Sequence, residues 1–239
     1  MEKYLNYVDW TINENKTLMY YKKLKQDNSI TYYRKKVYQI RKFLTFLHLN
    51  WANDIKLPSE PFYLPKRITI MDIDDTLSYF KNNKYFLQLK ALIFIGISSG
   101  MRAEELYQLT IEDIDLDNRI VHINHNPQNG QSTKTKHSRI SFFTEETGMA
   151  IDEYIAYFNY DRNLKQLFSP SHISRLFRDA PIKVKDLRKA FSQEWDRRGG
   201  QTSIKKILMG HSLKGDVDLM HYNAQSEGDL KKIYDKIML

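Results

Sequence analysis

An arginine stands at the edge of the most apolar segment of the chain. The run "ALIFIGIS" is followed by Gly100, then by Arg102, and Glu105 comes three residues later. Arg102 could simply pair with Glu105 on one helix face, a contact worth a few tenths of a kcal/mol. A guanidinium can also hold two oxygens of a phosphate at once. These residues alone leave both interpretations open.

A second cationic pair lies in "VKDLRKAF". Lys185 and Arg188 would share a helix face near the N-terminus of that helix, where cations oppose the helix dipole. This arrangement is tolerable on a solvated face and makes more sense if an anion binds there. Other residues whose side chains could take part in chemistry stand apart along the chain: Lys134 in a polar turn, His211 directly after Gly210, and Tyr222 in "LMHYNAQ".

The elements that must position these residues can be read from hydrophobic spacing. Apolar residues at helical intervals predict a helix over residues 29–48, with Ser29 as N-cap, and a shorter helix precedes it in "TLMYYKKLK". We therefore expect a basic helical domain over residues 1–57. Three prolines in "DIKLPSEPFYLPKR" predict a linker, placed at residues 58–66. The basic residues of this domain that could contact an anionic partner are Arg34, Lys35, Lys36, Arg41 and Lys42.

The remaining residues, 67–239, predict a second domain. A helix should begin at Asp72 or Asp74, and "KYFLQLKALIFIGISSG", apolar on nearly every side, predicts a central buried helix that ends at Gly100. "NRIVHINHN" and "SRISFF" predict two strands joined by the loop that carries Lys134, and helices follow. The expected fold is mainly α with a small antiparallel β-sheet.

Composition limits the classes of function. Hydrophobic residues make up 41% and charged residues 28%, as in an ordinary soluble globular protein, and there is no cysteine, which excludes a thiol nucleophile and cysteine-ligated metals. No apolar run is long enough to span a membrane. The net charge is +8 and the pI about 9.3, which favours a polyanionic partner. Residues 1–65 carry +5, residues 66–128 carry −2, and residues 129–239 carry +5.

The ordered set of segments resembles the tyrosine recombinase (phage-type integrase) family. "GMRAEEL", a hairpin with "TKTKHSRI", "VKDLRKAF", "LMGHS" and a late "HY" follow the order of the family's boxes over roughly residues 65–235. The lysine of the second box, where most members have histidine, is similar to integrases of archaeal viruses and plasmids. The spacing from His211 to Tyr222 is slightly longer than usual in the family.

The resemblance implies a small helical DNA-binding domain followed by a tyrosine-recombinase catalytic domain, and a site-specific DNA recombinase that forms a 3′-phosphotyrosine with double-stranded DNA. By matching positions, Tyr222 is the nucleophile, Glu105 supports Arg102, and Lys134 lies five residues before Arg139. The remaining catalytic residues implied are Arg102, Lys185, Arg188 and His211. Arg102 and Arg188 would clamp the phosphate, Lys134 would protonate the leaving oxygen, and His211 would donate a hydrogen bond. Lys185 could add charge or help to deprotonate the tyrosine, and these roles stay open.

Other expectations follow from the resemblance and from the sequence. Four protomers would act on two duplexes in the cytoplasm, with no membrane and no cofactor. No metal is expected either, because the acidic residues of 72–75 and 112–117 fit helix starts and turns. Tyr234, in a last amphipathic helix with Leu230 and Ile237, fits a packing role. The second function considered is a catalytically degenerate DNA-binding protein of the same fold. The third is a nicking-and-closing enzyme of the type IB topoisomerase kind.

Overall fold

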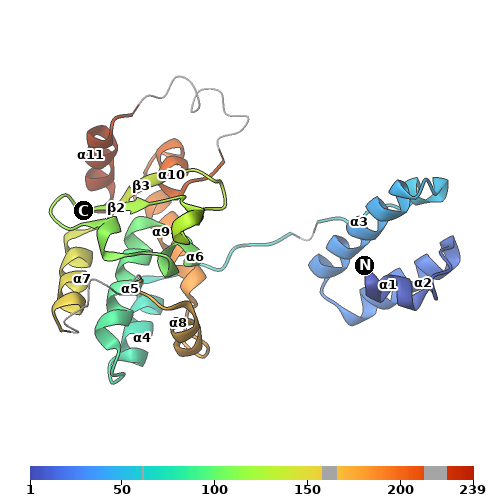
Figure 1. The fold of residues 1–239 in the computed structure, drawn as a ribbon, viewed down its shortest axis with the longest axis horizontal. Coiled ribbons are helices and arrows are strands. Elements are labelled where there is room, and N and C mark those ends of the chain that lie inside the picture. Colours follow the sequence, from blue (N-terminus) through green and yellow to red (C-terminus); the bar gives the residue numbers. More distant parts are fainter. Residues whose placement is uncertain (61, 158–165, 213–224) are drawn as a thin grey trace. The chain divides into compact units, whose positions relative to one another are not determined.

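The structure is a computed structural model that describes residues 1–60, 62–157, 166–212 and 225–239. The chain forms two compact units, Met1–Lys66 and Arg67–Leu239, and each is described by itself (Figure 1). In the described residues no helix is long and apolar enough to cross a bilayer.

The N-terminal unit is helical. It contains α1 (Glu2–Tyr7), α2 (Glu14–Asp27), α3 (Ile30–Phe46) and a 3-10 turn at Asn50–Asn53. Ser29 caps α3 as predicted, since its hydroxyl accepts a hydrogen bond from the backbone N–H of Tyr32. The side chains buried between these helices are Tyr4, Val8, Tyr20, Tyr21, Leu24, Val37, Ile40, Leu44 and Ala52. The short α1 was not predicted, although its Tyr4 is fully buried and bonds Thr17 at 2.7 Å.

The C-terminal unit is built around α5 (Phe86–Ser99), the predicted central helix. It packs against α4 (Ile70–Phe80), α7 (Glu145–Tyr157) and α9 (Val184–Arg197), which surround it in Figure 1. The helix ends at Gly100, whose φ of 66° lies in the left-handed region that glycine adopts without a Cβ penalty. The predicted start of α4 was late by a few residues, because the cap is Thr69 and Asp72 bonds back to it.

A small antiparallel sheet lies at one side of α5. In the described residues its strands are β1 (Ile114–Asp115), β2 (Ile120–Ile123) and β3 (Arg139–Phe142), in the order β1-β2-β3. Val121 faces Ser141 across the β2–β3 pair, and the loop between these strands carries Lys134. The two longer strands were predicted, whereas the two-residue β1 is too short to show alternation.

The remaining described helices are α6 (Ala103–Tyr107), α8 (Pro170–Leu176), α10 (Thr202–Met209) and α11 (Glu227–Met238). Trp195 of α9, Leu208 of α10, Phe142 of β3 and Tyr234 of α11 pack in one buried cluster. The C-terminal helix is therefore part of the interior of its own unit. The fold is mainly α with a small antiparallel sheet, as the sequence predicted.

Candidate active site

Arg102 is held where two backbone turns meet. It follows the left-handed end of α5 and forms the N-cap of α6. Its Nη1 donates to Glu105 Oε1 at 2.8 Å, and its Nη2 donates to the carbonyl of Gly210 at 3.0 Å. The pairing with Glu105 that the sequence suggested is present, but it is one of two contacts that fix the guanidinium.

Glu105 joins two arginines rather than one. Arg139 of β3 donates from Nη1 and Nη2 to the two carboxylate oxygens, at 3.0 and 2.7 Å, and the backbone N–H of Arg102 donates to Oε2 at 2.7 Å. The Glu105 side chain is only 2% exposed. Burial alone would raise its pKa, but the hydrogen bonds and charges of Arg139 and Arg102 hold the pKa down to about 2.

Arg139 was used in the sequence only to place Lys134, and the structure gives it a larger part. Besides gripping Glu105, its Nε donates to the carbonyl of Leu208 at 2.9 Å, at the end of α10. The sequence carried no signal for this role, because Glu105 and Leu208 lie far from Arg139 along the chain. Arg139 thereby ties the sheet to both α6 and α10.

Gly210 is required at its position by two features. Its φ is 62°, and a Cβ there would lie 2.8 Å from Cδ of Arg139. The carbonyl of Gly210 accepts from Arg102, and the next residue, His211, donates its N–H to the carbonyl of Lys206 at 2.9 Å. The glycine thus lets the chain turn tightly over the arginines and places His211 beside them.

Arg188 reaches the same place from α9. Its Nη1 donates to the carbonyl of Gly100 at 2.7 Å, two residues before Arg102. Burial and the positive charge of Arg102 lower the pKa of Arg188 to about 10, and Arg139 adds to this effect while Glu105 opposes it. The guanidinium still carries its charge at neutral pH, and its proximity to Arg102 creates a concentrated positive field.

His211 lies in that field. Burial first, and then the charges of Arg188 and Arg102, lower the pKa of its imidazole below the ordinary value. The ring is therefore neutral at neutral pH and can donate one hydrogen bond. Arg102, Arg188 and His211, which come from three separate segments of the chain, are thus gathered around the ends of α5 and α10.

Two predicted lysines are not bonded to this cluster. Lys185 is exposed on the first turn of α9, one turn before Arg188, and Lys134 is exposed in the β2–β3 loop. Neither lysine has a hydrogen bond or ion pair to another described residue.

Tyr222 lies outside the described residues. Tyr234, the neighbouring alternative, is fully buried, and its hydroxyl donates to the carbonyl of Ser98 at 2.8 Å. Burial, together with the nearby charge of Asp235, raises the pKa of the Tyr234 phenol well above its ordinary value. The packing role predicted for Tyr234 is confirmed.

The acidic segments have structural partners. Asp72 caps α4, and Asp115 accepts from the N–H and the side chain of Asn118 in the β1–β2 turn. Among the described residues, no group of three or more His, Asp and Glu side chains is placed to hold a metal ion.

The candidate DNA contacts on α3 differ in how they are held. Arg34 donates to the carbonyl of Pro58 at 2.8 Å and pairs with Glu60, and Arg41 donates to the carbonyl of Asn53 at 3.3 Å. Lys35 and Lys42 are exposed, and Lys36 lies over the ring of Tyr32. The lysines therefore offer their charge to solvent more freely than the arginines.

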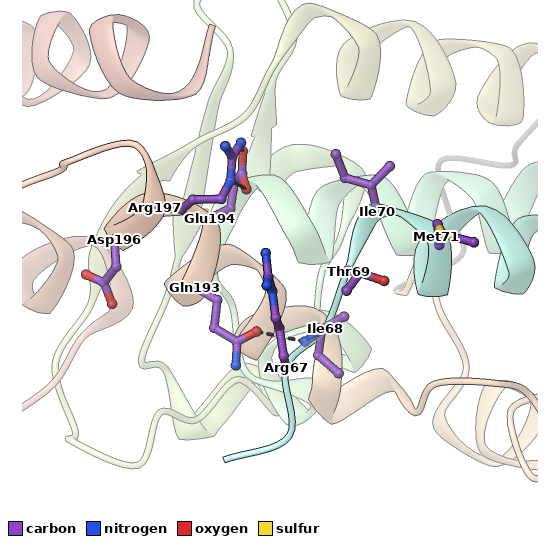
Figure 2. A pocket seen from close by; sticks show the side chains of 9 residues that line it. All are labelled: Arg67, Ile68, Thr69, Ile70, Met71, Gln193, Glu194, Asp196 and Arg197. Atoms are coloured by element: carbon purple, nitrogen blue, oxygen red, sulfur yellow. Dashed lines mark hydrogen bonds and ion pairs between the residues drawn. The ribbon is translucent and has the colours of Figure 1, made fainter. Parts of the chain in front are cut away.

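A separate open pocket of about 760 Å³ lies at the start of the C-terminal unit (Figure 2). Residues 67–71 form one wall and the C-terminal half of α9 the other, and Gln193 Oε1 accepts from the N–H of Ile68 across it at 2.8 Å. None of the predicted catalytic residues within the described ranges lines this pocket, so it is distinct from the arginine cluster.

Solved structures share the fold of this chain. The chain superposes on the Tn1549 transposon integrase in complex with transposon right end DNA with a TM-score of 0.68 and 16% identity, over 100% of this chain and 92% of that one. The crystal structure of XerA recombinase gives a TM-score of 0.51 and 19% identity, over 100% and 88%. At such identities the likeness establishes the fold, which is that of the tyrosine recombinases.

The sequence comparisons assign the family. The model of the phage integrase family matches residues 66–227, and the chain belongs to that family. It is also 30% identical over 137 residues to the tyrosine recombinase XerA of the archaeon Saccharolobus solfataricus. That match covers 56% of this chain and 40% of the relative, so the chain matches less than half the length of this relative.

Proposed function

We propose that the protein is a site-specific DNA recombinase or integrase that cleaves and rejoins double-stranded DNA through a 3′-phosphotyrosine. The observation that supports this most is the gathering of Arg102, Arg188 and His211 around the ends of α5 and α10. A cluster of fixed donors with a net positive charge suits the oxygens of one phosphate. Double-stranded DNA as partner agrees with the basic N-terminal unit and with the DNA-bound Tn1549 relative.

The proposed cleavage step is an in-line displacement at phosphorus. The oxygen of Tyr222 forms a bond to phosphorus while the bond to the 5′ oxygen breaks. The phenolic proton leaves to a base or to water, and the 5′ oxygen takes a proton from Lys134. Tyrosine has an ordinary pKa of about 10, so loss of its proton must accompany attack.

The fixed groups act on the charge that develops at phosphorus. Arg102 and Arg188 each use one donor on a backbone carbonyl and keep others for the non-bridging oxygens. His211, as a neutral ring, donates one further hydrogen bond. Lys185 adds positive charge near the N-terminus of α9 or assists in deprotonation of the tyrosine.

Rejoining is the reverse step with a different DNA end. The phosphotyrosine keeps the energy of the broken bond, so a 5′ hydroxyl of a second strand can displace the tyrosine without an external energy source. Complete exchange between two duplexes breaks both strands of each duplex, which makes four cleavages. We therefore extend the proposal to a homotetramer on paired DNA, with one tyrosine for each cleavage.

The test is a covalent trap. DNA bound by the protein is selected from a random pool, built as a nicked suicide duplex, and incubated with the wild type and with Tyr222→Phe. The wild type should give an adduct on a denaturing gel and the variant none. An adduct with Tyr222→Phe contradicts the assignment of the nucleophile.

The second candidate, a degenerate DNA-binding protein of the same fold, is favoured by Lys185, which stands where most members of the family have histidine, and by the longer spacing from His211 to Tyr222. Salt-dependent binding of the selected duplex without any adduct would support it. Relaxation of supercoiled plasmid regardless of sequence would instead support a nicking-and-closing enzyme.

A further inference from the structure

The loop between β2 and β3 carries Lys134 and is fastened by side chains on both sides of that lysine. We propose that Gln108, Asp113 and Thr133 are positioning residues that fix this loop and so present Lys134 to the leaving 5′ oxygen. The inference rests on the proposed function, because it concerns the proton that Lys134 gives in that reaction.

Gln108 connects the loop to the element that holds the arginines. It follows directly on α6, three residues after Glu105, and its Oε1 accepts from the N–H of Ser132 at 2.5 Å. One short helix therefore fixes Arg102 through Glu105 and the loop through Gln108. The placement of the phosphate clamp and that of the lysine loop depend on the same helix.

Asp113 fastens the first residue of the loop and its middle to one carboxylate. Its Oδ1 accepts from Nδ2 of Asn124 at 2.7 Å, and its Oδ2 accepts from Nε2 of Gln131 at 2.9 Å. Its Oδ2 also accepts from the N–H and the hydroxyl of Thr110, both at 2.8 Å. The carboxylate is buried and bonded through both oxygens, so the loop from Asn124 to Gln131, three residues before Lys134, has little freedom.

Thr133 fixes the backbone immediately before Lys134. It is 5% exposed, and its N–H donates to Nδ1 of His125 at 3.1 Å. Its hydroxyl donates to the carbonyl of His137 at 3.0 Å and accepts from the N–H of His137 at 3.2 Å. The backbone on the N-terminal side of Lys134 is thus fixed by Thr133. The lysine side chain itself is exposed and has no bonded partner among the described residues.

This arrangement suits a general acid on a loop. The lysine must reach a 5′ oxygen that becomes basic only as its bond to phosphorus breaks, so the side chain has to stay free while its base stays in place. A displacement of about 1 Å in such a group can cost about a hundredfold in rate. Loss of one anchor should therefore slow proton transfer without weakening DNA binding.

The test compares two leaving groups. The probe is the suicide duplex on which the wild type forms its adduct, made with either oxygen or sulfur at the 5′ bridging position of the scissile phosphate. A thiol is far more acidic than an alcohol, so a sulfur leaving group departs without a proton. Lys134→Ala should lose about a hundredfold or more on oxygen and little on sulfur.

Gln108→Ala and Thr133→Val should show the same pattern as Lys134→Ala, with smaller losses of rate. We expect losses of about ten- to a hundredfold on oxygen and rates within about threefold of wild type on sulfur. The matched control is Asn118→Ala, which removes one side-chain hydrogen bond, from Nδ2 of Asn118 to Asp115, within the β1–β2 turn. It should match wild type on both substrates.

Equal losses on oxygen and sulfur, or no loss on either, overturn the inference while Lys134 keeps its role. Failure of sulfur to rescue Lys134→Ala overturns the role of Lys134, and the absence of any wild-type adduct overturns the proposed function.

A measurement that needs no cleavage is amide hydrogen exchange over residues 130–138. Exchange there should be about tenfold faster in Gln108→Ala than in wild type and unchanged in Asn118→Ala, and unchanged exchange in Gln108→Ala contradicts the inference.

Discussion

At the scale of single residues, the carboxylate of Glu105 holds the site together, because it accepts four hydrogen bonds from Arg102 and Arg139 while almost fully buried. Removing one member of a buried ionic group leaves the others without compensation and typically costs about 3–5 kcal/mol. Glu105→Gln keeps the shape and removes the charge, so it should destabilise the protein by about 3 kcal/mol at pH 7. Urea denaturation measures this difference.

The pH dependence of that difference follows from the pKa of Glu105. The folded-state pKa is lowered from 4.5 to about 2, so the stabilisation is complete above the unfolded value and is lost as the pH falls toward the folded value. The gap between wild type and Glu105→Gln should therefore narrow between pH 4.5 and pH 2. Glu104→Gln, an exposed neighbour on the same helix, should show no such gap, and equal stability of wild type and Glu105→Gln at pH 7 contradicts the account.

Arg102→Ala separates catalysis from binding. In the proposed reaction this side chain contacts one phosphate, whereas DNA affinity would be spread over many cations, so binding should stay within about threefold of wild type. Cleavage of the suicide duplex should fall by about a hundred- to a thousandfold. Arg102→Lys retains the charge without the planar fork and should also lose most of the cleavage. Equal loss of binding and cleavage would identify Arg102 as a structural residue or a simple contact.

The sequence revealed some of these residues and not others. Arg102, Arg188 and His211 could be predicted because they stand in short segments with family resemblance. The wider role of Arg139 could not, because its partners Glu105 and Leu208 lie far away in the chain and meet it only after β3 is placed. The anchors of the lysine loop were hidden for the same reason, since polar residues in a loop read as solvated until their partners are known.

At the scale of elements, the packing of α5 on α9 sets the position of Arg188. A Cβ on Gly96 of α5 would lie 2.7 Å from Cδ1 of Leu187, the residue before Arg188. Gly96→Ala should destabilise the protein by about 1–3 kcal/mol through overpacking, although alanine favours helices. Thermal or urea unfolding measures the change.

The control for this packing is a second helical glycine. Gly148 in α7 has its nearest neighbour, Phe143, at an ordinary 3.5 Å, so Gly148→Ala should be neutral or stabilising by up to about 1 kcal/mol. Leu187→Ala removes the side chain that the new Cβ would meet, so the double variant with Gly96→Ala should lose less stability than the sum of the two single losses. Similar effects of the two glycine substitutions would show that the contact between α5 and α9 is not tight.

The long periodic helices were predicted from the sequence, and the short elements were not. The apolar residues of α5 and the spacing in α3 each extend over several turns, which gives a strong pattern. β1 has two residues and α1 has six, too few to show a period, and both depend on contacts made elsewhere in the fold.

At the scale of the whole molecule, the net charge is divided unequally. Residues 1–66 carry +6 of the total of +8, and residues 67–239 carry +2. Each unit has its own buried core. A chain of residues 67–239 should therefore fold cooperatively by itself and bind the selected duplex much more weakly, because most of the net positive charge is gone.

The salt dependence of binding distinguishes this effect from a general loss of affinity. The logarithm of the binding constant falls with the logarithm of salt concentration in proportion to the number of phosphates neutralised. The slope for residues 67–239 should be shallower than that of the full chain, measured by fluorescence anisotropy between 50 and 200 mM salt. An unchanged slope would mean that the N-terminal unit makes few contacts to phosphates.

Arg188 and Arg102 are each braced by a peptide oxygen, from Gly100 and Gly210 respectively. These acceptors are backbone carbonyls, so they remain in place after any side-chain substitution that leaves the backbone conformation unchanged. Under the proposed function, a library aimed at new target sequences can therefore keep Glu105 and Arg139, vary other surrounding residues, and retain these two backbone acceptors of the guanidinium groups. Substitutions at the two glycines are the changes that such libraries should leave out.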